Sequence, residues 1–297
     1  MHRPHPLRRA SVWFLLLLVV LGTLLGCSTL DEKQRAWIFQ PSKNTWSGGA
    51  YAAEGMDEVW IDFDSAETGQ PVRLNALWLA QPEADAPVLL YLHGARWNVR
   101  SSATRMRRLH SLGFAVLGVD YRGFGQSTDT LPSETLAGED ARAAWDWLAQ
   151  RHGALPRYLF GHSLGAAIAV NLAAQVSDEA GVIVEGSFPS IADVVAASRW
   201  GWLPVSALIT QRFEAGERVA AIGSPLLVVH GSDDRLIPPA LGRSLYERAR
   251  EPKRFELVEG GSHHNTNSVG LDQYRSAVRE VFGLFGEHSA ALHRALR

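Results

Sequence analysis

The sequence Gly161-His162-Ser163-Leu164-Gly165 is the stretch that decides the fold. It follows a short apolar run ending at Phe160 and precedes a small-residue run over 166–174, so we expect a strand, a sharp turn and a helix in that order. A serine on such a turn stands clear of the sheet, and the first N–H groups of the helix can stabilise a developing anion. The stretch therefore predicts that Ser163 is a nucleophile. A small-residue turn with an idle serine is the simpler alternative.

Apolar runs and helical patterns alternate on both sides of this turn. Residues 59–63 and 72–80 predict two antiparallel strands, and the shorter apolar runs predict buried strands at 88–92, 114–119, 158–160, 182–184, 226–229 and 255–258. Helical patterns cover 101–112, 133–152, 239–250 and 273–285. The alternation indicates an α/β fold, in which helices cover both faces of a mainly parallel sheet. Functional side chains should then lie at the carboxyl ends of the strands.

Two later loops supply a candidate acid and a candidate base. The predicted strand 226–229 runs into a loop that contains Asp233 and Asp234, and either aspartate suits the role of acid or caps the following helix. The strand 255–258 leads into a glycine-rich loop that holds His263 and His264. A histidine there can reach across the strand ends to a serine, although a surface histidine pair is the alternative.

An early loop supplies a candidate oxyanion hole. His93-Gly94-Ala95 follows the predicted strand 88–92. The backbone N–H of Ala95 can pair with that of Leu164, so that two donors face an oxyanion formed beside Ser163.

These motifs together resemble those of the α/β-hydrolases, in particular the Bem46-like, ABHD-type branch of the serine hydrolases. The matching segments are Leu92-His93-Gly94, Asp120-Tyr121-Arg122-Gly123-Phe124-Gly125-Gln126-Ser127, the Ser163 turn, His230-Gly231-Ser232-Asp233-Asp234-Arg235-Leu236-Ile237-Pro238 and Gly260-Gly261-Ser262-His263. The resemblance extends over about residues 36–285. It implies an α/β-hydrolase domain over 57–297, with a small cap inserted at about 187–222.

The resemblance also assigns roles to single residues. The family's H-G-x-x-D pattern implies that Asp234 is the acid, and its G-x-H pattern implies that His263 is the base, with His264 the weaker choice. Many members of this branch carry asparagine and glycine after the early His-Gly, whereas this chain continues with Ala95, Arg96 and Trp97. We therefore expect Arg96 and Trp97 to reshape the acyl pocket and to contact substrate.

Arginines are frequent after this loop. The group comprises Arg96, Arg100, Arg105, Arg107 and Arg108. They form either a solvated helix face or a contact for an anionic substrate or a lipid phosphate, for which Arg96 is best placed.

The N-terminus has the features of a targeting segment. Arg3, Arg8 and Arg9 precede an uncharged apolar run over 12–25. A helix of that length spans about 21 Å, short of a bilayer core of about 30 Å, which favours a signal peptide over residues 1–26. The run ends in Leu24-Leu25-Gly26-Cys27, which resembles a lipobox and implies that Cys27 is lipidated. A retained anchor or a plain secreted protein are the alternatives.

The expected location follows from this segment. Ser28 after the cysteine is typical of lipoproteins sorted to the outer membrane of diderm bacteria, so we expect a lipid-anchored protein of the cell envelope that faces the periplasm. Residues 27–56 are expected to form a linker and an N-terminal arm, in which Ser47-Gly48-Gly49 breaks any regular structure.

We expect a serine hydrolase that cleaves a carboxylic ester or a thioester through an acyl-enzyme. Its substrate would be a small-molecule or lipid ester, and no cofactor or metal is expected. The net charge of −2 gives no indication of nucleic-acid binding. The alternatives are a non-catalytic envelope binding or scaffold protein with the same fold and an acyltransferase that uses the same triad. The sequence leaves the acyl chain length and the oligomeric state open.

Overall fold

A computed structural model describes residues 28–199, 201–202 and 206–284. Its centre is an eight-stranded sheet in the order β1-β2-β4-β3-β5-β6-β7-β8. The strands are β1 (Asp57–Asp64), β2 (Pro71–Leu79), β3 (Val88–Leu92), β4 (Ala115–Val119), β5 (Arg157–His162), β6 (Gly181–Glu185), β7 (Leu226–Gly231) and β8 (Lys253–Val258). β2 pairs antiparallel with β1 and β4, and the pairs from β4 to β8 are parallel. The expected α/β fold, with an antiparallel start to a mainly parallel sheet, is confirmed.

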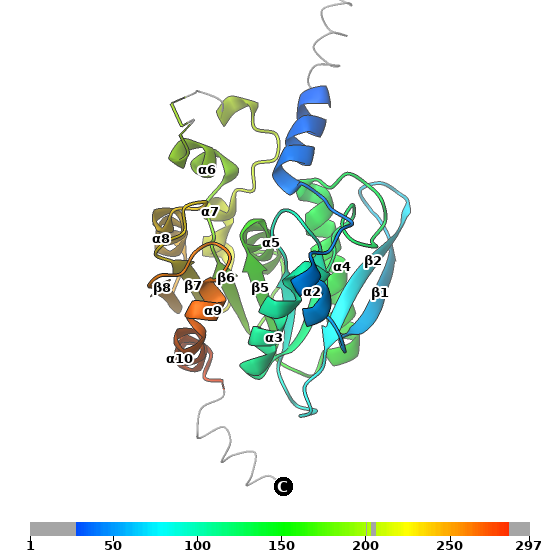
Figure 1. Cartoon of the computed structure of the whole chain (residues 1–297), viewed down its shortest axis with the longest axis vertical. Coiled ribbons are helices and arrows are strands. Elements are labelled where there is room, and N and C mark those ends of the chain that lie inside the picture. Colours follow the sequence, from blue (N-terminus) through cyan, green and yellow to red (C-terminus); the bar gives the residue numbers. More distant parts are fainter. Residues whose placement is uncertain (1–27, 200, 203–205, 285–297) are drawn as a thin grey trace, which may run out of the picture.

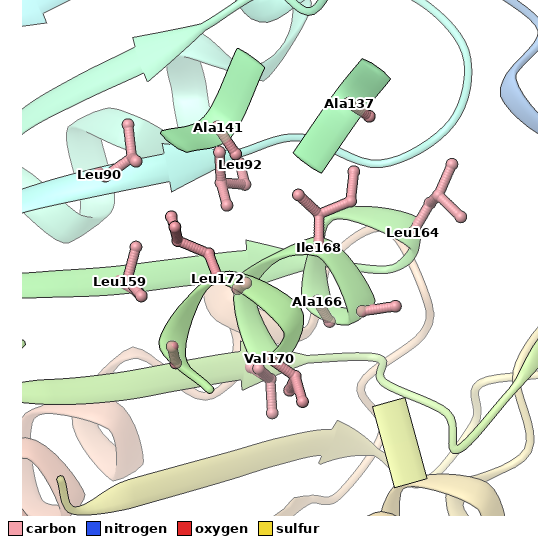
Figure 2. Close-up of a cluster of buried hydrophobic side chains, with 14 of the residues drawn as sticks. Leu90, Leu92, Ala137, Ala141, Leu159, Leu164, Ala166, Ile168, Val170 and Leu172 are labelled. Carbon is pink, nitrogen blue, oxygen red and sulfur yellow. The ribbon is translucent and has the colours of Figure 1, made fainter. Parts of the chain in front are cut away.

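Helices cover both faces of this sheet (Figure 1). α4 (Glu134–His152), α5 (Leu164–Ala173) and α8 (Pro239–Arg248) pack on one face, and α3 (Ala103–Ser111) and α10 (Leu271–Phe282) pack on the other. Figure 2 shows Leu90 and Leu92 of β3 beside Ile168 and Leu172 of α5. The alternate residue of β3, Tyr91, belongs to the cluster on the opposite face. Because both faces are buried, the central strands are continuous apolar runs in the sequence.

Two helices lie in the segment over residues 27–56, for which the sequence predicts a linker and an N-terminal arm. Residues 28–39 are helical, and Phe39 at the end of that helix is fully buried against Phe124 and Phe213. The expectation that Ser47-Gly48-Gly49 breaks regular structure is wrong, because these residues begin α2 (Ser47–Ala52). The Trp46 indole beside α2 donates to the Ser101 carbonyl at 2.9 Å. Packing against the 3-10 turn Val99–Ser102, which precedes α3, therefore outweighs the low helix propensity of glycine.

The chain between β6 and β7 makes an excursion at the end of the sheet where the cap was expected. It contains α6 (Ile191–Ala197), a 3-10 turn at Ser206–Leu208 and α7 (Ala215–Arg218). Gln34 connects the helix over residues 28–39 to this segment between β6 and β7. Its side chain donates to the Leu208 carbonyl at 2.6 Å and accepts from the Thr210 N–H at 2.9 Å. Figure 1 shows this helix and α6 at the same end of the molecule. The domain boundaries remain predictions.

The N-terminal expectations fall on residues that the structure does not describe. The signal peptide over 1–26 and the lipidation site Cys27 both lie outside the described residues. Within residues 28–199, 201–202 and 206–284, no helix has the length and apolar character needed to cross a membrane.

Candidate active site

Ser163 sits on the turn between β5 and α5, as the sequence predicts. Its backbone has φ 55° and ψ −121°, a conformation that non-glycine residues adopt only where the surrounding structure enforces it. The Ser163 N–H donates to the Glu185 carbonyl at 2.9 Å, which fixes the turn to the end of β6. A Cβ atom at position 165 would lie 2.2 Å from the Leu92 carbonyl oxygen. Only glycine at 165 lets α5 begin this close to β3.

The loops after β7 and β8 bring an aspartate and a histidine to this serine. His263 Nε2 lies 2.9 Å from Ser163 Oγ, and His263 Nδ1 lies 2.7 Å from Asp234 Oδ2. Asp234 and His263 are both buried. The alternatives do not join this arrangement, because Asp233 and His264 are exposed and make neither contact. The imidazole of His263 thus bridges a hydroxyl and a carboxylate in the order that a serine nucleophile, a base and an orienting acid require.

The surroundings of Asp234 keep its carboxyl group ionised. Burial alone would raise its pKa, but hydrogen bonds from His230 and His263 and from the Ile237 N–H outweigh burial and hold the pKa well below its usual value. The Leu236 and Ile237 N–H groups donate to Asp234 Oδ1 at 3.0 and 2.8 Å. One oxygen is therefore fixed by the backbone, and the other faces His263.

The His93-Gly94-Ala95 loop lies against the nucleophile. A Cβ atom built on Gly94 would be 3.0 Å from the Cβ of Ser163. The Arg96 N–H already donates to the Phe39 carbonyl at 2.8 Å, whereas none of the backbone hydrogen bonds in the described part of the chain is donated by the Ala95 N–H. Leu164 is the first residue of α5, so its N–H has no acceptor within the helix. Both N–H groups predicted to form the oxyanion hole are thus left without a backbone acceptor of their own.

Arg96 and Trp97 give this loop an unusual backbone. They are consecutive non-glycine residues with φ 68° and 60°, and both side chains are exposed. Arg96 Nε donates to the Gln40 side chain at 2.7 Å. Asp120 fixes the far side of the loop by accepting from the Val99 N–H at 2.6 Å. The loop is therefore held from both ends, and Arg96 and Trp97 project from its middle.

The arginines that follow this loop do not form a single surface. Arg100 pairs with Glu58, Arg107 donates to the carbonyls of Ala52 and Glu54, and Arg108 donates to Asn267. Arg105 is largely buried and pairs with Glu185. Arg107 is exposed, as the interpretation of a solvated helix face expects, whereas Arg105 is largely buried, and Arg96 is the member that lies on the site loop.

Sequence reasoning missed the side chains behind the site. Glu185 is 1% exposed and contacts Arg105 of α3 and Tyr274 of α10. His162, in the motif itself, donates from Nε2 to the His263 carbonyl at 2.9 Å. The available signal was the glutamate that ends the otherwise apolar strand β6, where a buried charged side chain needs a partner.

No group of three or more His, Cys, Asp or Glu side chains that could hold a metal ion occurs within the residues the structure describes.

Comparison with protein families gives a match over most of the sheet. The family described as serine aminopeptidase S33 matches residues 83–215 and 199–268. An uncharacterized protein of Mycobacterium tuberculosis is 34% identical over 258 residues, which cover 84% of this chain and 89% of that protein.

Two named animal proteins are also similar. The zebrafish lysophosphatidylserine lipase ABHD12 is 33% identical over 215 residues, which cover 66% of this chain and 56% of the lipase. Human protein ABHD12B is 36% identical over 236 residues, which cover 70% of this chain and 64% of that protein.

Solved structures share the fold at low sequence identity. An esterase from Pyrococcus furiosus superposes with a TM-score of 0.64 at 18% identity, covering 82% of this chain and 96% of the esterase. A hydrolase from Agrobacterium vitis has a TM-score of 0.59 at 20% identity, covering 77% of this chain and all of that one.

Proposed function

Because the chain belongs to the serine aminopeptidase S33 family and is an α/β-hydrolase enzyme, we propose that it cleaves a carboxylic ester or a thioester through an acyl-enzyme on Ser163. The observation that carries the proposal is the position of His263, with Nε2 at 2.9 Å from Ser163 Oγ and Nδ1 at 2.7 Å from Asp234. A base within hydrogen-bond distance of a hydroxyl group activates it as a nucleophile.

The proposed reaction has two halves. Ser163 Oγ attacks the carbonyl carbon while His263 Nε2 takes its proton, and the N–H groups of Ala95 and Leu164 stabilise the oxyanion. His263 then gives the proton to the leaving alcohol or thiol, and the acyl group stays on Ser163. Water attacks the acyl-enzyme with His263 as base again, which releases the acid and the free serine. Asp234 orients His263 and stabilises its charged form.

We propose a monoacyl lipid ester with an anionic head as the substrate. Arg96 is exposed on the loop beside Ser163 and carries a planar cation that suits a phosphate or a carboxylate. Burial and nearby His263, Arg105 and Arg96 lower the pKa of His264, so this edge of the site already holds several cationic or potentially cationic groups. Relatives that carry the name lysophosphatidylserine lipase support this choice.

We further propose that Cys27 carries a lipid that anchors the mature chain in the cell envelope. The support is the sequence Leu24-Leu25-Gly26-Cys27 after the apolar run over 12–25. Cys27→Ser should abolish labelling by a fatty-acid analogue and release the protein from the membrane fraction. Retention of the lipid label in this variant would contradict the assignment.

The reaction is tested with a fluorophosphonate probe on the purified protein. Intact mass should show one adduct on the wild type and none on Ser163→Ala, a small change at a turn that should leave the fold intact. Hydrolysis of p-nitrophenyl esters of graded chain length should disappear with the adduct. A folded wild type that takes no label and cleaves no ester would favour the non-catalytic binding protein, whereas acyl transfer to an added alcohol or amine in preference to water would favour the acyltransferase.

The choice of headgroup is tested separately. Arg96→Gln should raise KM several-fold for lysophosphatidylserine and leave KM for a neutral monoacylglycerol unchanged. An equal effect on both substrates would remove Arg96 from headgroup recognition without touching the assignment of Ser163.

A further inference from the structure

A buried ion pair joins α3 to the end of β6 beside the loop that carries His263. Arg105 Nε donates to Glu185 Oε1 at 3.0 Å, and Arg105 Nη2 donates to the His264 carbonyl at 3.2 Å. The other carboxylate oxygen of Glu185 accepts from the Tyr274 hydroxyl of α10. A single guanidinium therefore connects the sheet to the loop over residues 260–267.

Glu185 is also connected to the nucleophile. Its backbone carbonyl accepts from the Ser163 N–H at 2.9 Å. The main chain of Glu185 therefore contacts the nucleophile, and its side chain is connected through Arg105 to the loop that carries His263. On the other side of the loop, His162 Nε2 donates to the His263 carbonyl at 2.9 Å. The carbonyls of His263 and His264 are thus both fixed, one from β5 and one from α3.

The energetics of a buried ion pair argue for a role beyond stability. Removing two charges from water is unfavourable for each ion, and well-packed apolar side chains of similar volume often stabilise a fold as much or more. Arg105 and Glu185 are almost wholly buried, with side chains 11% and 1% exposed. What apolar replacements cannot supply is a forked donor that binds a carboxylate and a loop carbonyl at the same time.

We propose that Arg105 and Glu185 are positioning residues, which hold His263 Nε2 within hydrogen-bond distance of Ser163 Oγ. The proposal rests on the proposed hydrolysis. A misplacement of reacting groups by about 1 Å can lower a rate by about a hundredfold, so a loosened loop should be seen in kcat before it is seen in stability.

The test compares Arg105→Met and Glu185→Gln with Arg107→Met, a matched control. Arg107 lies on the same helix, but it donates to the Ala52 and Glu54 carbonyls, away from His263. Both test variants should lose about tenfold to a hundredfold in kcat per labelled serine, with KM within about twofold of the wild type. Arg105→Lys should recover part of kcat, and Arg107→Met should match the wild type.

A second readout does not depend on turnover. Amide hydrogen exchange over residues 260–267 should be faster in Arg105→Met than in the wild type and in Arg107→Met. If Ser163 proves inert in every assay, the proposed function fails, and faster exchange in this loop still supports the positioning role. Unchanged exchange together with unchanged kcat overturns the positioning role while the hydrolase remains. If Arg105→Met does not fold, Arg105→Gln and Arg105→Lys are compared in its place.

Discussion

The carbonyl oxygen of Phe39 accepts a hydrogen bond of 2.8 Å from the N–H of Arg96. This contact joins the end of the helix over residues 28–39 to the loop beside Ser163. Because the Arg96 N–H is occupied in this way, the loop leaves the N–H of Ala95 as its donor for the proposed oxyanion. The helix over residues 28–39 therefore supports the loop beside Ser163, and we expect its removal to lower the activity of the site.

Phe39→Ala should test this link. The side chain is fully buried between Phe124 and Phe213, so truncation should lower the free energy of unfolding by about 3–5 kcal/mol. Urea unfolding measures the loss, and ester hydrolysis by the remaining folded protein should also fall. Trp37→Ala on the same helix is the control, since Trp37 is 67% exposed and its loss should cost about 0.5 kcal/mol or less. Equal losses of unfolding free energy in the two variants would mean that burial of Phe39 is not what stabilises the attachment of this helix.

Asp234→Asn should separate orientation of the base from its presence. The amide has one acceptor oxygen, for which His263 Nδ1 would compete with the Leu236 and Ile237 N–H groups, and it carries no charge to stabilise a protonated imidazole. We therefore expect kcat to fall by about 10⁴ with little change in KM. Steady-state hydrolysis and the rate of fluorophosphonate labelling should fall together. Asp233→Asn is the matched control, because Asp233 is exposed, and it should behave as the wild type. A large loss in Asp233→Asn instead would reassign the acid.

Arg122→Met should damage stability rather than chemistry. Arg122 is 1% exposed and donates to Asp140 at 2.7 Å as well as to Glu139 and the Leu136 carbonyl, away from Ser163. The variant leaves the buried Asp140 carboxylate unpaired, which should cost about 3–5 kcal/mol. The double variant Arg122→Met/Asp140→Leu should recover much of that loss, and the fraction that folds should keep the wild-type kcat. A kcat of the folded fraction that is well below the wild-type value would contradict the prediction that Arg122 affects stability and not chemistry.

The predictability of the fold follows from the burial of its strands. Leu89 to Leu92 is apolar throughout because helices cover both faces of β3, and that composition is visible without coordinates. The elbow at Ser163 was predictable for a similar reason, since Gly165 is required by a close approach to Leu92. The sequence pattern predicts the structure correctly where the type of element alone determines what surrounds a residue, as in a strand covered by helices on both faces.

The features that sequence reasoning missed depend on pairs far apart in the chain. Nothing near Arg105 indicates that its partner is Glu185, eighty residues later. The helix at Ser47–Ala52 forms against Ser101 despite two glycines, and the left-handed backbone of Arg96 and Trp97 is held by Phe39 and Asp120. Such contacts are consequences of the assembled sheet, and they override local propensity.

His162→Gln should flatten the dependence of stability on pH. Burial, together with the nearby Arg105 cation, lowers the pKa of His162 well below its usual value, so the unfolded chain binds a proton here that the folded chain does not. The free energy of unfolding should therefore fall as pH drops below about 6.5, the value for an unfolded-state histidine, by up to about 1.4 kcal/mol per pH unit from this residue.

Glutamine keeps an N–H donor for the His263 carbonyl but takes up no proton, so urea unfolding between pH 7 and pH 5 should show a smaller slope in His162→Gln than in the wild type. His264→Gln is the comparison, because partial burial also lowers the pKa of His264 but its side chain is far more exposed than that of His162, and the slope should change less. The same slope in wild type and His162→Gln would show that His162 takes up its proton in the folded protein as readily as in the unfolded chain, and its bond to the His263 carbonyl would then persist with a charged ring.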